Sequence, residues 1–161
     1  MLLLNGDETP QEVIALSYGL EEGLQKFYVA AANLAIDPEV IQILAELAGI
    51  EVRHKQRLFE LYLAVESKPQ DRVAFETEIK SEMTEGGFNP DKLLEQNLST
   101  FKSTAGVLNF AMMLEAQAMD LYLRYADKCE DQKVKAILFK MANEEKAHLK
   151  RLGDLQGKHG K

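Results

Sequence analysis

Two four-residue segments, EVRH at residues 51–54 and EKAH at residues 145–148, share the pattern Glu-x-x-His and lie 94 positions apart. A further glutamate precedes each segment by 30 residues, Glu21 in the first half and Glu115 in the second. One Glu-x-x-His is common in helical proteins, but two copies with equally spaced upstream glutamates indicate an internal duplication. Four carboxylates and two imidazoles are the ligand set of a dinuclear metal site in a four-helix bundle.

Residues three apart on a helix lie on the same face, so each Glu-x-x-His can present both side chains to one metal. The predicted metal ligands are Glu21, Glu51, His54, Glu115, Glu145 and His148. Carboxylates with two imidazoles suit Fe(II) or Mn(II) better than a closed zinc site. Two other interpretations stay open: surface Glu and His side chains on amphipathic helices, and a bundle that binds structural zinc or no metal.

Aromatic residues follow the same repeat. Tyr28 and Tyr122 come seven residues after Glu21 and Glu115, an interval that returns nearly to the same helix face. We expect their hydroxyls to form hydrogen bonds with the ligand carboxylates. Ordinary core tyrosines and a redox-active phenol are the alternatives.

Charged residues beside the ligands are expected to face outward. Glu22 and Glu144 each neighbour a ligand in sequence, but one residue turns the side chain by about 100° around the helix. We therefore expect them to be solvated surface charges. Arg57 and Arg151, which also repeat, are expected to form surface ion pairs.

The composition favours one helical domain over residues 1–161, with few Gly and Pro and no alternating runs of β-branched residues. The formal net charge is −7, and the Lys and Arg residues are spread out, which argues against nucleic acid as a partner. Cys129 is the only cysteine, so a disulfide or an iron–sulfur site within the chain is excluded. The absence of a signal-peptide pattern and of a long apolar run predicts a cytoplasmic protein that is not inserted in a membrane.

Periodicity and capping residues predict an all-α antiparallel four-helix bundle made of two hairpins. The expected helices span 11–36, 38–66, 104–128 and 131–155. Residues 67–103 form the expected long crossover, with a short helix at 70–84, a loop at 85–90 and further helical turns at 91–102. The glycine-containing tail at 157–161 is expected to be disordered.

The ligand segments, including residues 21–28 and 115–122 with their Glu-to-Tyr spacing of seven, resemble the ferritin-like superfamily and its rubrerythrin-like branch over roughly 11–155. This resemblance implies two bound Fe ions, with Mn or Zn as substitutes. It also implies that Glu51 and Glu145 bridge the metals, while Glu21 and Glu115 are terminal ligands. Peroxide or O2 would be the oxidant of Fe(II).

Two departures from rubrerythrins bear on the reaction. The chain has no rubredoxin module with paired Cys-x-x-Cys motifs, which implies an external electron donor such as a rubredoxin-like protein. Met112 and Ala118 stand one turn either side of Glu115, where rubrerythrins supply an extra carboxylate. The six-ligand set therefore resembles ferroxidase or oxidase centres more closely, and a homodimer is expected by analogy with the family.

The leading hypothesis is a non-haem di-iron, or Fe/Mn, oxidoreductase of peroxidase or ferroxidase type with a role in oxidative stress. Iron binding with ferroxidase storage is the main alternative. A hydroxylase acting on an organic substrate is a third hypothesis. A structural or regulatory metal module, cut from a larger fusion protein such as one with a rhodanese-like domain, is the fourth.

Overall fold

The computed structural model describes residues 8–85, 95–96 and 103–159, and its architecture is helical throughout these ranges. The helices are α1 (Pro10–Leu34), α2 (Pro38–Val65), α3 (Arg72–Glu85), α5 (Thr104–Lys128) and α6 (Gln132–His159). No strand occurs in the described ranges, so the all-helical prediction is confirmed. No helix in these ranges is long and apolar enough to cross a membrane.

The first hairpin consists of α1 and α2, whose ends are fixed by capping residues. Thr9 caps α1 in a capping box: its hydroxyl accepts from the Glu12 N–H at 3.2 Å, and its own N–H donates to the Glu12 carboxylate at 2.7 Å. Asp37 caps α2 by accepting from the N–H groups of Glu39 and Val40. Only residues 35–37 separate the two helices, so α1 and α2 pack along each other.

The second hairpin, α5 and α6, is built in the same way. Ser103 caps α5 by accepting from the Gly106 N–H at 3.0 Å. Asp131 accepts from the N–H groups of Lys133 and Val134 at the start of α6, at 2.8 and 3.1 Å. The connection between the helices covers only residues 129–131, so this hairpin is as tight as the first.

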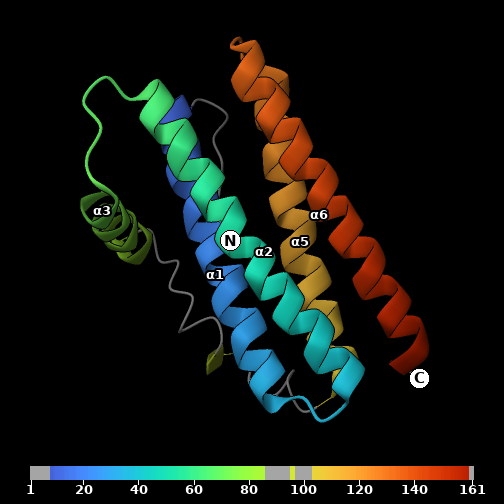
Figure 1. The fold of residues 1–161 in the computed structure, drawn as a ribbon. Helices are drawn as coiled ribbons and strands as arrows, with labels where there is room; N and C mark the ends of the chain where they lie inside the picture. The colour runs from blue at the N-terminus through green and yellow to red at the C-terminus, as the bar shows by residue number, and fades with distance from the viewer. Residues whose placement is uncertain (1–7, 86–94, 97–102, 160–161) are drawn as a thin grey trace.

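The hairpins lie side by side, with α1 against α5 and α2 against α6 (Figure 1). Above and below the middle of the helices, the interior between the hairpins is filled by buried apolar side chains. Its largest side chains include Leu24, Phe27, Leu44, Leu58, Leu108, Leu138, Met141 and Leu152. The duplicated motifs sit at mid-helix within this interior, so their polar side chains are held far from the helix ends.

Helix α3 lies outside the hairpins, against α1 and α2 (Figure 1). Its anchor is Phe75, whose ring centre is 4.3 Å from that of Tyr62, 5.1 Å from Tyr18 and 5.4 Å from Phe59. Helix α3 falls within the segment expected as the crossover. The expected loop at 85–90 begins one residue too early, because Glu85 is the last residue of α3. The rest of this loop and the helical turns expected at 91–102 lie almost entirely outside the described residues.

The expectation of a disordered tail from residue 157 is wrong for residues 157–159, which complete α6. His159 lies 3.4 Å from the Asp37 carboxylate and 3.2 Å from that of Glu39, and Lys158 lies 3.0 Å from Glu39. Basic residues in the last turn also interact favourably with the helix dipole. The end of α6 is therefore tied to the start of α2, a contact that glycine content and chain position do not reveal.

Candidate metal centre

The six predicted ligands come together between the two hairpins. Helix α1 contributes Glu21, α2 contributes Glu51 and His54, α5 contributes Glu115, and α6 contributes Glu145 and His148. All are buried: five have no exposed surface, and His148 retains 4%. Each of the four long helices therefore supplies at least one carboxylate to the same buried volume.

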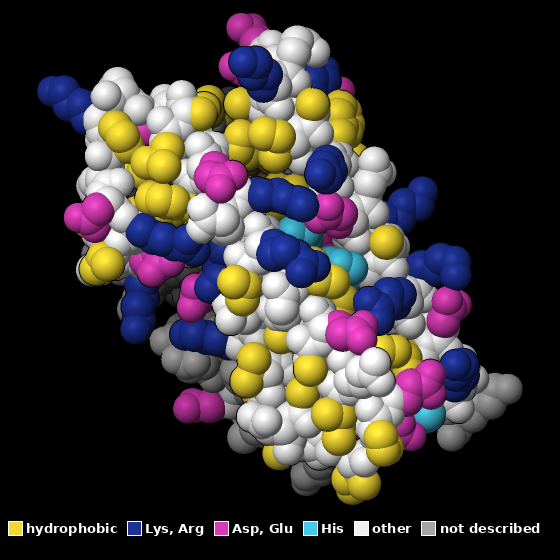
Figure 2. Space-filling view, viewed as in Figure 1, with side chains coloured by type: hydrophobic (Ala, Val, Ile, Leu, Met, Phe, Trp, Pro, Cys, Tyr) yellow, Lys and Arg dark blue, Asp and Glu magenta, His cyan; other side chains and the backbone are white. Residues whose placement is uncertain are grey.

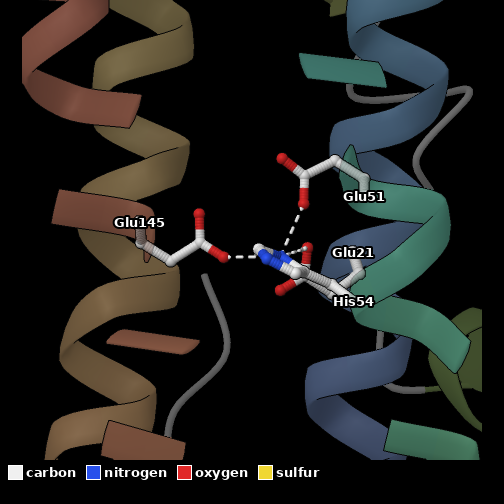
Figure 3. Close-up of side chains that lie close together, drawn as sticks. All are labelled: Glu21, Glu51, His54 and Glu145. Atoms are coloured by element: carbon white, nitrogen blue, oxygen red, sulfur yellow. Dashed lines mark ion pairs between the residues drawn. The ribbon is translucent and has the colours of Figure 1, made fainter. Parts of the chain in front are cut away.

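The first group surrounds the imidazole of His54 (Figure 3). Its Nδ1 lies 2.8 Å from Oε1 of Glu145, 3.0 Å from Oε2 of Glu51 and 3.5 Å from Oε2 of Glu21. Glu145 reaches across from the second hairpin, whereas the other three residues belong to the first (Figure 3). The group is thus completed only where the hairpins meet.

The second group surrounds His148. Its Nδ1 lies 3.0 Å from Oε2 of Glu145, 3.5 Å from Oε1 of Glu115 and 3.8 Å from Oε1 of Glu51. The two imidazoles are stacked, with ring centres 5.8 Å apart and planes inclined by 21°. Glu51 and Glu145 belong to both groups, and each directs one oxygen to His54 and the other to His148.

The donor atoms fit a bound cation because several are buried without a hydrogen-bond partner. These orphaned atoms are Oε2 of Glu21, both oxygens of Glu51, Nδ1 of His54, Oε2 of Glu115 and Oε1 of Glu145. Nδ1 of His54 is close to three carboxylates, yet none of these contacts has the geometry of a hydrogen bond. Burying unpaired carboxylates is costly, whereas metal coordination satisfies them. Within each group the potential ligand atoms lie within 4.8 Å of one another.

Burial and mutual proximity shift the pKa values of these groups in the metal-free protein. Burial, and then the charge of Glu21, raise the pKa of Glu51, and burial also raises that of Glu115. Burial opposes protonation of His148, but hydrogen bonds with Glu115 and Glu145 outweigh it and raise the pKa to about 9. The centre therefore retains protons at neutral pH, and a divalent metal must displace them to bind.

Tyr28 and Tyr122 are fully buried, and each donates its hydroxyl proton to a carboxylate of the opposite hairpin. Tyr28 on α1 bonds to Glu115 on α5, and Tyr122 on α5 bonds to Glu21 on α1. Burial raises the pKa of both phenols well above the usual value, so they remain neutral donors. The predicted contacts are present, but the crossing between hairpins was not foreseen.

Glu144 is not the solvated surface charge that its position on the helix suggested. Its Oε2 lies 2.7 Å from Nε2 of His54 and 2.6 Å from Nη1 of Arg57. Burial acts to raise the pKa of Glu144, but hydrogen bonds with Arg57 and His54 outweigh it and lower the pKa. Glu144 is thus an ionised carboxylate that reaches a candidate ligand from the neighbouring hairpin.

The other flanking charges lie where expected, at the surface and in ion pairs. Arg151 donates to Glu46 with 2.6 Å between Nη2 and Oε2, and both side chains are exposed. Glu22 bonds to Lys55 at 2.9 Å. Figure 2 shows histidine atoms at the middle of one face of the molecule, with basic and acidic side chains around them.

The fold and the site define a helical protein with a buried acid and histidine cluster able to hold metal. The family model described as Rubrerythrin matches residues 106–161, which include Glu115, Glu145 and His148. This match, which covers the second hairpin, confirms the rubrerythrin-like resemblance of the sequence. Comparison with curated proteins and with solved structures gave no significant match.

Proposed function

We propose that this chain is a non-haem di-iron redox protein of rubrerythrin type, built as a ferritin-like antiparallel four-helix bundle. The six residues Glu21, Glu51, His54, Glu115, Glu145 and His148 would hold two Fe ions, with Mn as a substitute, and Glu51 and Glu145 would be ligands shared by both. One observation carries the proposal: each of these two glutamates directs one oxygen to each imidazole. A carboxylate that faces two donor groups in this way is suited to join two cations.

Charge and ligand type support iron. Four ionised carboxylates with two neutral imidazoles carry four negative charges, which two divalent cations neutralise. Carboxylate and imidazole donors suit Fe(II) and Mn(II). When bound, two Fe(II) ions supply two electrons to peroxide or O2 and are oxidised to Fe(III).

The protein residues fix the donors and limit the access of water. Tyr28 and Tyr122 hold Glu115 and Glu21 from the opposite hairpin, so neither carboxylate can turn away without losing a buried hydrogen bond. The complete burial of the carboxylates excludes bulk water from their oxygens.

The reductant is proposed to be a rubredoxin-like protein or a further domain of that type, because the single cysteine of this sequence cannot form a rubredoxin iron site. A homodimer is proposed by analogy with the family. A cytoplasmic location is proposed because a single cysteine fits a reducing compartment. Storage of oxidised iron is the second candidate, favoured by Met112 and Ala118 at positions where rubrerythrins supply an extra carboxylate. Storage requires a large hollow oligomer, so a dimeric mass in size-exclusion chromatography would exclude it.

The proposal is tested by loading the metal-free protein with Fe(II) under anaerobic conditions and then adding peroxide. The expected result is two Fe per chain and a new near-ultraviolet absorption band after oxidation. Glu51→Ala and Glu145→Ala should each abolish dinuclear binding, whereas Glu60→Ala, which alters an exposed carboxylate on α2, should bind as the unmodified protein does. Two tightly bound metals in both site variants would contradict the ligand assignment.

A further inference from the structure

The two candidate metal positions have identical donor sets. One consists of Glu21, Glu51, His54 and Glu145, and the other of Glu115, Glu51, His148 and Glu145. Each set therefore contains three carboxylates and one imidazole, and each terminal glutamate accepts a hydrogen bond from a buried tyrosine. The types of donor therefore do not distinguish the positions, and a difference in chemistry has to be sought in the residues around them.

The repeat is broken next to the ligands at one position. Glu144 contacts Nε2 of His54, and its counterpart 94 residues earlier is Ile50. Isoleucine has no hydrogen-bond acceptor in its side chain, so the first hairpin cannot offer His148 the carboxylate that the second offers His54. Ile50 instead packs against the apolar core.

The arginines that flank the histidines follow this difference. Arg57 bonds to Glu144 at 2.6 Å and so holds the carboxylate in place against His54. Its counterpart Arg151 bonds at the same distance to Glu46, one helical turn before Ile50. The guanidinium groups are equivalent in the repeat, but only Arg57 is linked to a candidate ligand through its acidic partner.

We propose that Glu144 is a positioning residue that makes the two metal positions unequal, so that the position containing His54 fills first and more tightly. This inference rests on the proposed binding of two metals by the six ligands. When a metal is bound, the Glu144 carboxylate accepts a hydrogen bond from Nε2 of His54, so the lone pair of Nδ1 faces the other donors. The carboxylate also makes the imidazole a stronger base and fixes its orientation, effects that change metal affinity by about 10–100-fold.

The test is a calorimetric titration of the metal-free protein with Co2+ alone, at fixed pH and without oxidant. We expect the unmodified protein to bind two Co2+ in two resolved steps. Glu144→Ile, which copies Ile50 into the second hairpin, should weaken the first step by about 10–100-fold and bring the two steps together. Glu144→Gln keeps an acceptor without the charge and should give an intermediate affinity.

Two further variants separate positioning from a general change in surface charge. Glu46→Gln breaks the equivalent arginine pair without touching a histidine, and should leave both steps unchanged. Ile50→Glu places a carboxylate at the equivalent position for His148 and should tighten the second step. Proton NMR at one equivalent of Co2+ should show one strongly shifted, slowly exchanging N–H signal, from Nε2 of His54, that disappears in Glu144→Ile.

Each result has a definite meaning. Two equal affinities in the unmodified protein, or a Glu144→Ile titration and spectrum identical to those of the unmodified protein, would overturn the inference while leaving the metal centre intact. Equal losses in Glu144→Ile and Glu46→Gln would also overturn it, since a general charge effect would then explain both. Failure of the unmodified protein to bind any Co2+ would overturn the proposed metal centre itself.

Discussion

Glu51 and Glu145 are fully buried carboxylates, and burying each of these residues has a cost in free energy. Moving an ionised group out of water costs several kcal/mol unless charge and hydrogen bonds compensate it. The metal-free protein compensates only in part, because both oxygens of Glu51 lack a hydrogen-bond partner. Such a costly arrangement indicates a binding function, since stability alone would favour apolar side chains at these positions.

The tyrosine contacts give the first prediction at this scale. Tyr122→Phe removes a buried donor and leaves an oxygen of Glu21 unsatisfied, so the free energy of unfolding of the metal-free protein should fall by about 1–3 kcal/mol. Urea denaturation followed by circular dichroism measures this loss. Tyr125→Phe is the matched control, because its hydroxyl makes only a 3.4 Å bond to the Glu8 carbonyl. Equal losses in the two variants would argue against a special role for Tyr122.

Most of the candidate centre could be predicted residue by residue, because a repeated interval of 94 identifies positions that must share a helix face. Glu144 could not be predicted in this way. The helical offset from Glu145 correctly implies a different direction, but a glutamate side chain is long enough to reach His54 on α2. Contacts between neighbouring helices depend on their separation and rotation, which spacing within one helix does not determine.

At the scale of helices, the boundaries are set by short-range hydrogen bonds that the sequence displays directly. The observed α1 and α2 begin at Pro10 and Pro38, each directly after a capping residue. The sequence does not reveal that α6 extends to His159, because the stabilising partners Asp37 and Glu39 lie at the start of α2. Local chemistry therefore predicts where these helices start better than where the last one ends.

The capping box of α1 provides a second prediction. Thr9→Ala removes the oxygen that accepts from the Glu12 N–H, and should lower the free energy of unfolding by about 1 kcal/mol. Thr9→Ser keeps that oxygen and should be close to the unmodified protein. Thermal or urea unfolding of the three proteins checks this order, and a fully stable Thr9→Ala protein would contradict the proposed cap.

Helix α3 provides a third prediction, which concerns its attachment to the first hairpin. Phe75→Ala removes a ring that is buried among Tyr18, Phe59 and Tyr62, and should cost about 3 kcal/mol of unfolding free energy. Val73→Ala, at a position 74% exposed on the same helix, should cost less than about 0.5 kcal/mol. Both variants should still bind two metals, because α3 supplies none of the six candidate ligands.

At the scale of the whole molecule, the centre joins both hairpins, because each of the four long helices supplies at least one of its carboxylates. Metal should therefore stabilise the entire bundle against unfolding. Each independent site contributes about 2.7 kcal/mol when the free metal concentration is 100 times its dissociation constant. Co2+ should raise the melting temperature of the unmodified protein, and a chelator should reverse the change. A similar rise in Glu51→Ala would show that the metal stabilises the protein from somewhere else.

The difference between Glu144 and Ile50 has an evolutionary consequence. A symmetric pair of identical hairpins, associated as separate chains, must change both halves whenever one residue mutates. After duplication and fusion, the two copies can diverge independently, so a substitution can reach one imidazole and spare the other. Joining the hairpins in one chain thus permits the two halves of the candidate centre to differ around the same repeated glutamates and histidines.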